Sequence, residues 1–396
     1  MTCTHEEDDQ LFSHGCPVNE ATSGPGVHAL VIGVSHYPLR KRPWHPRFRS
    51  LPQFEDVPGC ATGAACFATF LESRFLDPAE IPLRTVRLLL SPTEDELPFL
   101  PAGRWQDATA VNVRDALERW QEDCDSNHDN VAILYVAGHG VAGPAAGLFA
   151  FLGGANQLND PYVESINLMA VAESLKTCQA RSNIYIYDCC ATAVAPQGTS
   201  CGIYPPVPVA ASDYSGREFQ LNIMAARMGA KGYTISAAEG TLFSKAFLPL
   251  LDTAGELIGG TFTITKNRLQ RELPEAVRHA HPDVPNIDGK EPSVNGEHAP
   301  HGINRPQPAP SFPVDFLPEP TSTALPLDFC IRFGGQVVDR GELNGHQHTV
   351  NLPAGNYRVE VAWQDGEHGT CRSFYDLCVD RRKQVVAATG EESAQW

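Results

Sequence analysis

The sequence lacks the features of a nucleic-acid-binding protein. It contains no run of Lys and Arg, and its formal net charge is −17. Sequence-independent binding to nucleic acid depends on clustered positive charges that neutralise phosphates. The acidic excess is spread along the chain, and we interpret it as a contribution to solubility. We therefore expect no nucleic-acid partner.

A long apolar segment is also missing. A transmembrane helix needs roughly 18 consecutive apolar residues, and no segment of the chain reaches that length. The first residues, MTCTHEEDDQLFSHGC, have neither a basic start nor an apolar centre, so they do not resemble a signal peptide. We expect a cytoplasmic protein without a membrane partner.

The twelve cysteines form no disulfide or zinc framework. They are scattered and include no CxxC pair, whereas disulfide scaffolds are short and dense in Cys and structural zinc sites use closely spaced pairs. Several lie in apolar runs, where a thiol packs like a small hydrophobic side chain. This pattern indicates free thiols in a reducing compartment. There is no EF-hand calcium loop either, so we expect no cofactor and no obligatory metal.

The first two thirds of the chain show the pattern of an α/β fold. Strands are predicted at residues 28–33, 86–90, 131–137, 183–188 and 232–237, a hairpin strand at 148–152, and helices at 59–75, 108–120, 166–178, 243–251 and 265–279. Short apolar strands that alternate with helices are typical of a mainly parallel sheet between two helical layers. Ligands bind such sheets outside the carboxyl ends of the strands.

The chain is long enough for two folded units. Residues 1–26 are polar and are predicted to form a flexible N-terminal segment, and residues 27–290 hold the α/β pattern. Pro recurs among polar residues in 291–325, as in an interdomain linker. Residues 326–396 contain short runs that alternate apolar and polar side chains, which predicts a small antiparallel β-sandwich.

A histidine and a cysteine follow two of the predicted strands directly. His139 follows the strand at 131–137, and Cys190 follows the strand at 183–188. A cysteine peptidase needs a thiolate, a base that generates it and donors for the tetrahedral oxyanion. We expect His139 to be the base and Cys190 the nucleophile, with the backbone N–H groups of Gly140 and Cys190 as the oxyanion hole. Taken alone, Gly-His-Gly is more simply a tight turn, because short motifs often match by chance.

The segment Asp188-Cys189-Cys190 offers two thiols. Side chains alternate between the faces of a strand, so residues 188 and 190 share one side and Cys189 lies on the other. A carboxylate at a strand end belongs more naturally in a cleft than in the core, which assigns Cys190 to the cleft and Cys189 to packing. Asp188 is then either a capping residue or the floor of a specificity pocket that receives Arg or Lys. A metal site built on Cys189 and Cys190 is disfavoured, because adjacent cysteines on a strand point in opposite directions.

These residues resemble a known family. Tyr135-Val-Ala-Gly-His139-Gly is similar to the Y-x-x-G-H-G motif of metacaspases and bacterial caspase-like peptidases, and Asp188-Cys189-Cys190 is similar to their D-x-C segment. In caspases the His also precedes the Cys by about 50 residues. Further similar segments occur in the family's order at residues 28–34, 57–64, 235–248 and 282–286. The resemblance covers roughly residues 27–290.

The resemblance implies a caspase-like three-layer α/β/α sandwich and hydrolysis of peptide bonds by a His139–Cys190 dyad. Asp188 matches the family's acid two residues before the nucleophile, which implies cleavage after a basic residue. One departure concerns Gly63, because the family often places a second acid at this position. Many relatives are zymogens cut in the loop after the nucleophile, where Arg217 is the only basic residue of 191–218. Some metacaspases require calcium, although no calcium motif is present here.

Relatives in bacteria often cut one dedicated protein in a stress or antiviral pathway, so the resemblance implies a protein substrate. The alternative is a catalytically silent caspase-like scaffold that binds a partner, which the presence of both dyad residues disfavours. The C-terminal sandwich is either a docking module for an activating or regulatory partner or a stabilising appendage, and its sequence does not decide between them.

Overall fold

The computed structural model describes residues 16–17, 24–38, 54–142, 147–157, 161–190, 192–193, 219–226, 234–280, 291–297, 302–318, 327–344, 346–365 and 369–387. The chain divides into two compact units. The first comprises Met1–Leu251 and Lys266–Ile303, and the second comprises Asp252–Thr265 and Asn304–Trp396. No helix in the described ranges is both long and apolar enough to cross a membrane.

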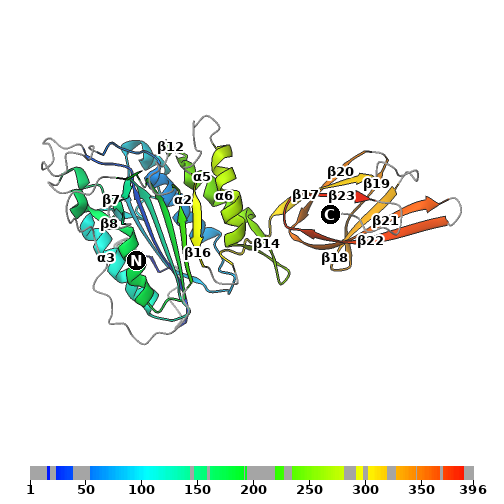
Figure 1. The fold of residues 1–396 in the computed structure, drawn as a ribbon, viewed down its shortest axis with the longest axis horizontal. Helices are drawn as coiled ribbons and strands as arrows, with labels where there is room; N and C mark the ends of the chain where they lie inside the picture. Colours follow the sequence, from blue (N-terminus) through cyan, green and yellow to red (C-terminus); the bar gives the residue numbers. More distant parts are fainter. Residues whose placement is uncertain are drawn as a thin grey trace, which may run out of the picture. The chain divides into compact units, whose positions relative to one another are not determined.

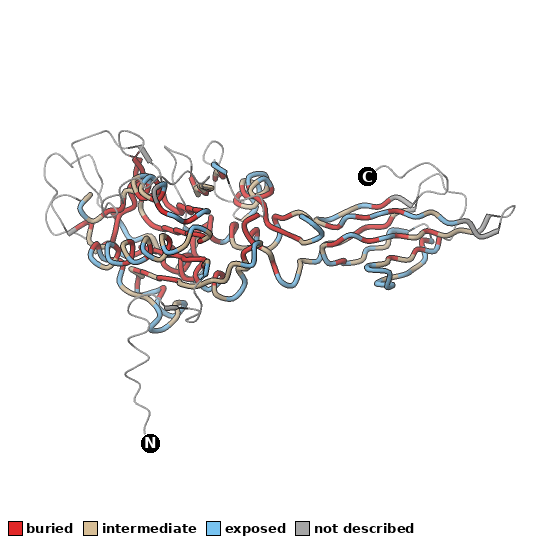
Figure 2. The backbone as a smooth tube through the Cα atoms, turned by 90° about the horizontal axis from the view of Figure 1, so that it is seen from below, coloured by how far each residue is buried: buried red, intermediate tan, exposed pale blue. Residues whose placement is uncertain are grey.

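A mainly parallel sheet forms the centre of the first unit (Figure 1). Its strands lie in the order β1 (Cys16–Pro17), β3 (Leu83–Ser91), β2 (Val27–Val34), β5 (Val131–Gly138), β9 (Ser182–Cys189), β11 (Phe219–Met224) and β16 (Ser293–Gly296), with β4 (Gln106–Asp107) paired to β3. Strands β3 to β11 run parallel, whereas β1 and β16 are antiparallel at the two ends. Every residue of β2, β5 and β9 is buried, as expected of strands covered on both faces (Figure 2).

Helices cover both faces of this sheet. Figure 1 shows α3 (Ala110–Asp125) on one side of the strands and α2 (Cys60–Ser73), α5 (Leu242–Thr253) and α6 (Lys266–Ala280) on the other. The side chains of α4 (Leu168–Ser174) join the same buried cluster as those of α3. The predicted three-layer α/β/α fold is confirmed.

Successive side chains of the strands point to opposite faces of the main sheet. Leu30 and Leu134 pack with Trp120 of α3, whose indole N–H donates to the His28 carbonyl at 3.0 Å. On the opposite face the ring of Tyr135 stacks on that of Phe67 of α2, with centroids 4.7 Å apart. Each large side chain buried in this way contributes roughly 2–3 kcal/mol to folding.

A smaller sheet lies beyond the carboxyl ends of β5 and β9. Its order is β10 (Thr192–Ala193), β6 (Gly140–Ala142), β7 (Leu148–Phe151) and β8 (Ser165–Asn167). The hairpin strand predicted at 148–152 is β7, and its partner β6 begins one residue after His139. The small sheet therefore pairs the chain again from Gly140 after His139 and from Thr192 after Cys190.

The second unit is a β-sandwich. One sheet has the order β20 (His348–Pro353), β17 (Ser311–Pro318) and β23 (Lys383–Ala387), and the other β19 (Gln336–Leu343), β18 (Leu327–Phe333), β21 (Gly355–Asp365) and β22 (Gly369–Val379). Residues from both sheets form its buried core, for example Phe316 stacked on Phe329 at 5.1 Å. All neighbouring strands are antiparallel except β17 and β23, which are parallel.

The unit boundaries differ from the sequence prediction. The segment predicted as a linker, 291–325, contains β16, which belongs to the main sheet, and β17, which belongs to the sandwich. The prolines of this segment suggested a linker. Pro313, however, lies one residue before Val314, where the pairing of β17 with β23 begins, so the N–H group that Pro313 lacks interrupts no hydrogen bond to β23. The hairpin of β14 (Gly255–Ile258) and β15 (Thr261–Ile264) also belongs to the second unit. Within the segment 1–26, which was predicted to be flexible, Cys16–Pro17 pairs with β3.

The sequence also missed one strand of the main sheet. The neighbour of β9 is β11, whereas the strand predicted at 232–237 corresponds to β12 (Thr234–Ser236), which pairs only with the short β13 (Gly240–Thr241) among the described strands. On β11 the residues Gln220, Asn222 and Met224 are half-buried and only Leu221 and Ile223 are buried. A strand with polar residues on one face lacks the continuous apolar run that marks β2, β5 and β9.

Candidate active site

Strand pairing brings His139 and Cys190 to the same edge of the main sheet. Strands β5 and β9 are parallel, and Gly138 at the end of β5 pairs with Cys189 at the end of β9. His139 and Cys190 are the next residues of their chains. Beyond them the chains pair again, because β6 and β10 run parallel with Val141 opposite Thr192. His139 and Cys190 therefore lie on neighbouring segments that are paired both before and after these two residues.

The glycines on either side of His139 make this arrangement compact. A Cβ atom added at Gly140 would lie 2.2 Å from the Cys190 carbonyl oxygen and 3.0 Å from the Cys189 sulfur. Gly138 has a φ of 148°, in the region that favours glycine, and a Cβ atom there would meet the Tyr37 hydroxyl at 2.8 Å. The Gly-His-Gly motif thus permits close approach between the end of β5 and both the end of β9 and Tyr37.

Two aromatic rings flank the imidazole of His139. The ring of Tyr37 lies 4.8 Å from it and that of Phe54 lies 5.2 Å from it, measured between centroids. The Tyr37 hydroxyl accepts a hydrogen bond from the His139 backbone N–H and donates one to the Phe151 carbonyl, both at 3.0 Å. Tyr37 therefore contacts the ring of His139 and also fixes its backbone.

The imidazole is oriented by a backbone carbonyl. Nε2 of His139 lies 2.8 Å from the Glu55 carbonyl oxygen, which can only accept a hydrogen bond. The proton of the neutral ring is therefore assigned to Nε2, which leaves the lone pair on Nδ1. Desolvation by burial lowers the pKa of His139 below its usual value, against the opposing effect of the Glu55 carbonyl. The ring is thus held neutral, with Nδ1 as its basic atom.

The two adjacent cysteines occupy different environments. Cys189 is 4% exposed and belongs to the buried cluster on the α3 face, in agreement with its prediction as a packing residue. Burial raises its thiol pKa well above the usual value. Cys190 is half-buried, and both residues are thiols rather than halves of a disulfide. Of the two residues, Cys190 is the more exposed.

Asp188 lies on the sheet face opposite Cys189. It is 5% exposed, and its Oδ2 atom accepts hydrogen bonds from the Tyr135 hydroxyl at 2.7 Å and from the Thr241 hydroxyl. Burial raises its pKa to about 6, and these two hydrogen bonds oppose the rise. Neither bond uses Oδ1.

Comparison with known families identifies the fold. A family model of the caspase domain matches residues 27–285, about two thirds of the chain. The chain belongs to the caspase-domain family of cysteine peptidases. A search of curated proteins found no match. The caspase-domain match covers the main sheet from β2 to β11 together with His139, Cys190 and Asp188.

Gly63 is the position at which the resemblance led us to expect a second acid. A Cβ atom added at this position would lie 2.8 Å from the Ser244 hydroxyl oxygen. Ser244 and Thr241 are joined by a hydroxyl hydrogen bond of 2.9 Å, and Thr241 in turn donates to Asp188. The hydroxyl residues Ser244 and Thr241 thus connect the neighbourhood of Gly63 to Asp188. Asp188 is the one carboxylate among these four residues.

A buried carboxylate at the start of α2 was not predicted from the sequence. Glu96 is fully buried and accepts hydrogen bonds from the Ser35 hydroxyl and from the backbone N–H groups of Gly59 and Thr62 through Oε1. Its Oε2 accepts from the N–H and hydroxyl of Thr93. A carboxylate at the N-terminus of α2 satisfies donors that the helix leaves unpaired. The only sequence signal was the Thr93-x-x-Glu96 capping pattern.

One predicted site residue, Arg217, lies outside the described residues. In the described ranges no group of three or more His, Cys, Asp or Glu side chains is arranged to hold a metal ion.

Proposed function

We propose that this caspase-domain protein is a cysteine endopeptidase with His139 as general base and Cys190 as nucleophile. The observation that carries the proposal is the register of β5 and β9, which places both residues at one sheet edge within the family's domain. The neutral, oriented imidazole and the partial exposure of Cys190 support the same roles.

In the proposed reaction, Nδ1 of His139 takes the thiol proton of Cys190 as the sulfur attacks the carbonyl carbon of the substrate. The tetrahedral oxyanion receives hydrogen bonds from the backbone N–H groups of Gly140 and Cys190. The imidazolium then gives its proton to the leaving amine, and an acyl-enzyme remains. Water, deprotonated by His139, attacks the thioester and releases the acid and the free thiol.

We propose Asp188 as the group that selects a basic residue before the scissile bond. Its Oδ2 atom is held by two hydroxyl groups, while Oδ1 takes part in neither bond and is left for a guanidinium or ammonium group. With a pKa of about 6 the carboxyl is mostly ionised at neutral pH. Since Gly63 supplies no second acid, the preference for Arg or Lys rests on Asp188.

The wider context is proposed from the family resemblance. We propose one dedicated protein substrate, a regulated bacterial stress or defence pathway in the cytoplasm, and activation by cleavage after Arg217. The C-terminal sandwich is a compact unit with its own core, which fits a docking module for a regulatory partner. Peptide mass spectrometry of the active enzyme tests the cleavage, because an intact 210–225 segment would disprove it.

A panel of fluorogenic peptides tests the enzymatic proposal. Peptides that end in Arg, Lys, citrulline or Asp before the fluorophore are compared, with and without calcium, and Cys190→Ala is the control. We expect cleavage after Arg or Lys, which the control abolishes. Absence of cleavage of every peptide would favour the silent scaffold instead.

A further inference from the structure

Asn156 is a buried polar residue that the proposed chemistry does not use. It lies in the short 3₁₀ helix Ala155–Gln157, which follows β7, and it is 0% exposed. A buried amide is costly unless its donors and acceptor find partners. All the partners of the Asn156 side chain are backbone atoms of the two residues that flank the His139 ring.

The hydrogen bonds of Asn156 join two separate segments. Its Nδ2 donates to the Phe54 carbonyl at 2.7 Å and to the Tyr37 carbonyl at 3.1 Å. Its Oδ1 accepts from the Phe54 N–H at 3.1 Å. The amide thus pairs with both polar groups of Phe54, as a neighbouring strand would, and ties this residue to Tyr37.

The constraint on Phe54 and Tyr37 is transmitted to His139. Fixing the Phe54 peptide groups fixes its ring, which contacts the imidazole, and the next carbonyl along the chain, that of Glu55, which accepts from Nε2. Fixing Tyr37 fixes the hydroxyl that binds the His139 backbone N–H. Each described polar contact of His139 with these two segments therefore involves a residue that Asn156 bonds or the residue next to it.

We propose that Asn156 is a positioning residue for the catalytic base, which keeps the His139 ring in its Nε2–H form by holding Phe54, Glu55 and Tyr37 in place. This inference rests on the proposed role of His139. Asn156 itself touches neither the substrate nor the reacting atoms, and it acts through the residues around the imidazole. The hydrogen-bond partners of the Asn156 amide are backbone groups of this chain.

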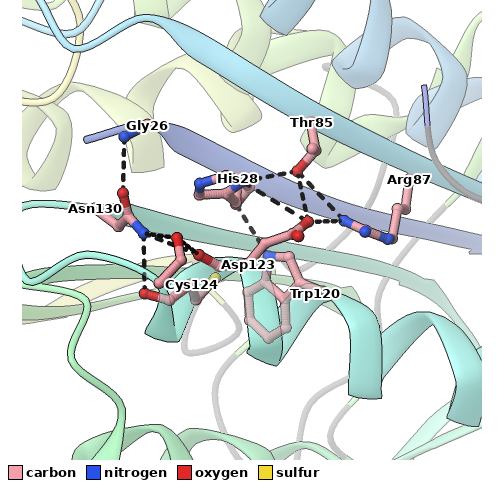
Figure 3. Close-up of polar contacts among 9 residues, drawn as sticks. Gly26, His28, Thr85, Arg87, Trp120, Asp123, Cys124 and Asn130 are labelled. Carbon is pink, nitrogen blue, oxygen red and sulfur yellow. Dashed lines mark hydrogen bonds and ion pairs between the residues drawn. The ribbon is translucent and has the colours of Figure 1, made fainter. Parts of the chain in front are cut away.

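The chain offers a matched control at the other end of the sheet. Asn130 is also 0% exposed, and its amide accepts from the Gly26 N–H at 2.7 Å and donates to the Asp123 and Cys124 carbonyls (Figure 3). Asn130 directly precedes β5, whereas His139 directly follows this strand. Asn130→Ala and Asn156→Ala remove similar buried bonds, so similar falls in melting temperature are expected, but only Asn156 is linked to the base.

The first experiment follows the alkylation of Cys190 by iodoacetamide between pH 5 and 8, read by mass spectrometry of its peptide. The titratable groups on the segments around His139 are His36, Tyr37, Glu55 and Asp56 on one side and Cys189 and Cys190 on the other, and all remain in each Asn variant. We expect Asn156→Ala to slow alkylation near pH 6.5 about 10- to 100-fold, with Asn130→Ala within about twofold of the parent protein.

The second experiment reads the tautomer of His139 by NMR with ¹⁵N-labelled histidine, assigned with His139→Gln. Asn156→Ala should lower the share of the Nε2–H form, and Asn130→Ala should not. Asn156→Leu is the second variant, since it has a similar size while removing the acceptor and both donated bonds without adding a titratable group. It should also slow alkylation and lower that share.

The outcomes separate the two proposals. If His139→Gln leaves the alkylation of Cys190 unchanged, the proposed dyad is wrong. If His139→Gln slows alkylation but Asn156→Ala and Asn156→Leu behave like Asn130→Ala in both measurements, the dyad stands and the role of Asn156 is wrong.

Discussion

Gly138 on β5 pairs in register with Cys189 on β9, so that His139 and Cys190 leave the sheet at the same level. The pairing is resumed beyond them by β6 and β10. The relative position of the two reactive residues is therefore set by backbone pairing rather than by contacts between their side chains. Substitutions that disturb this backbone should lower activity even when both side chains are retained.

Gly140→Ala tests this dependence on the backbone. The new Cβ atom would overlap the Cys190 carbonyl, which it would approach to 2.2 Å, so the two chain segments must separate. A displacement of about 1 Å at a catalytic group costs about 100-fold in rate. We expect kcat/KM on the best peptide to fall by about that factor, measured by fluorogenic hydrolysis.

Gly334→Ala is the matched glycine control for that experiment. Gly334 lies in the second unit with a φ of 56°, where a side chain is strained but no atom lies within 4 Å of the added Cβ. This variant should lose about 1 kcal/mol of stability and keep its kcat/KM. Equal activity of the two variants would show that the close approach at Gly140 is unimportant.

Asp188→Asn should stabilise the fold at neutral pH. The carboxyl has a pKa of about 6 in the folded protein against 3.8 in an unfolded chain. The folded state therefore binds the proton more tightly, and the free energy of unfolding falls as the pH rises from about 4 to about 6. Asn does not ionise, so the variant should gain about 1–3 kcal/mol at pH 7.5. Urea unfolding at pH 7.5 and at pH 4 measures the difference, which should vanish at the lower pH.

The same substitution should reduce specificity. Loss of one partner of a buried charge pair costs 2 kcal/mol or more, which corresponds to about 30-fold. We expect the ratio of kcat/KM for an Arg peptide over its citrulline analogue to fall by at least that factor. An unchanged ratio would remove Asp188 from the specificity pocket while leaving the stability prediction intact.

Phe54→Ala should raise the pKa of His139. Desolvation is the main cause of its lowered pKa, and removal of the Phe54 ring admits water to one side of the imidazole. Histidine NMR titration of both proteins gives the two values directly. The parent value should lie below 6.5 and the variant value closer to it. A parent value above 6.5 would contradict the neutral imidazole on which the account depends.

Much of the fold was predictable because its strands are strongly patterned. β2, β5 and β9 are continuous apolar runs, and the helices around them show clear spacing, so the α/β/α arrangement and the positions of His139 and Cys190 followed from the sequence. β11 was missed because Gln220 and Asn222 interrupt its apolar pattern, and the prolines of 291–325 hid β16 and β17. In each case pairing in the sheet outweighs local composition.

The surroundings of His139 were not predictable in the same way. Tyr37, Phe54 and Asn156 are 17 to 119 residues apart in the chain, and none belongs to a recognisable motif. Their association depends on tertiary packing, as does the burial of Glu96 beneath the start of α2. Apart from the capping pattern at Thr93 and Glu96, the sequence alone carries no signal for these contacts.

The central claim is that Cys190, activated by His139, is the nucleophile. It is tested most directly by incubation with a peptidyl chloromethyl ketone that ends in Arg, followed by mass spectrometry of the labelled peptide. We predict a single thioether on Cys190 that is absent in Cys190→Ala, strongly reduced in His139→Gln and retained in Cys189→Ala. Labelling of Cys189 in the parent protein, or labelling of Cys190 that does not depend on His139, would contradict the account.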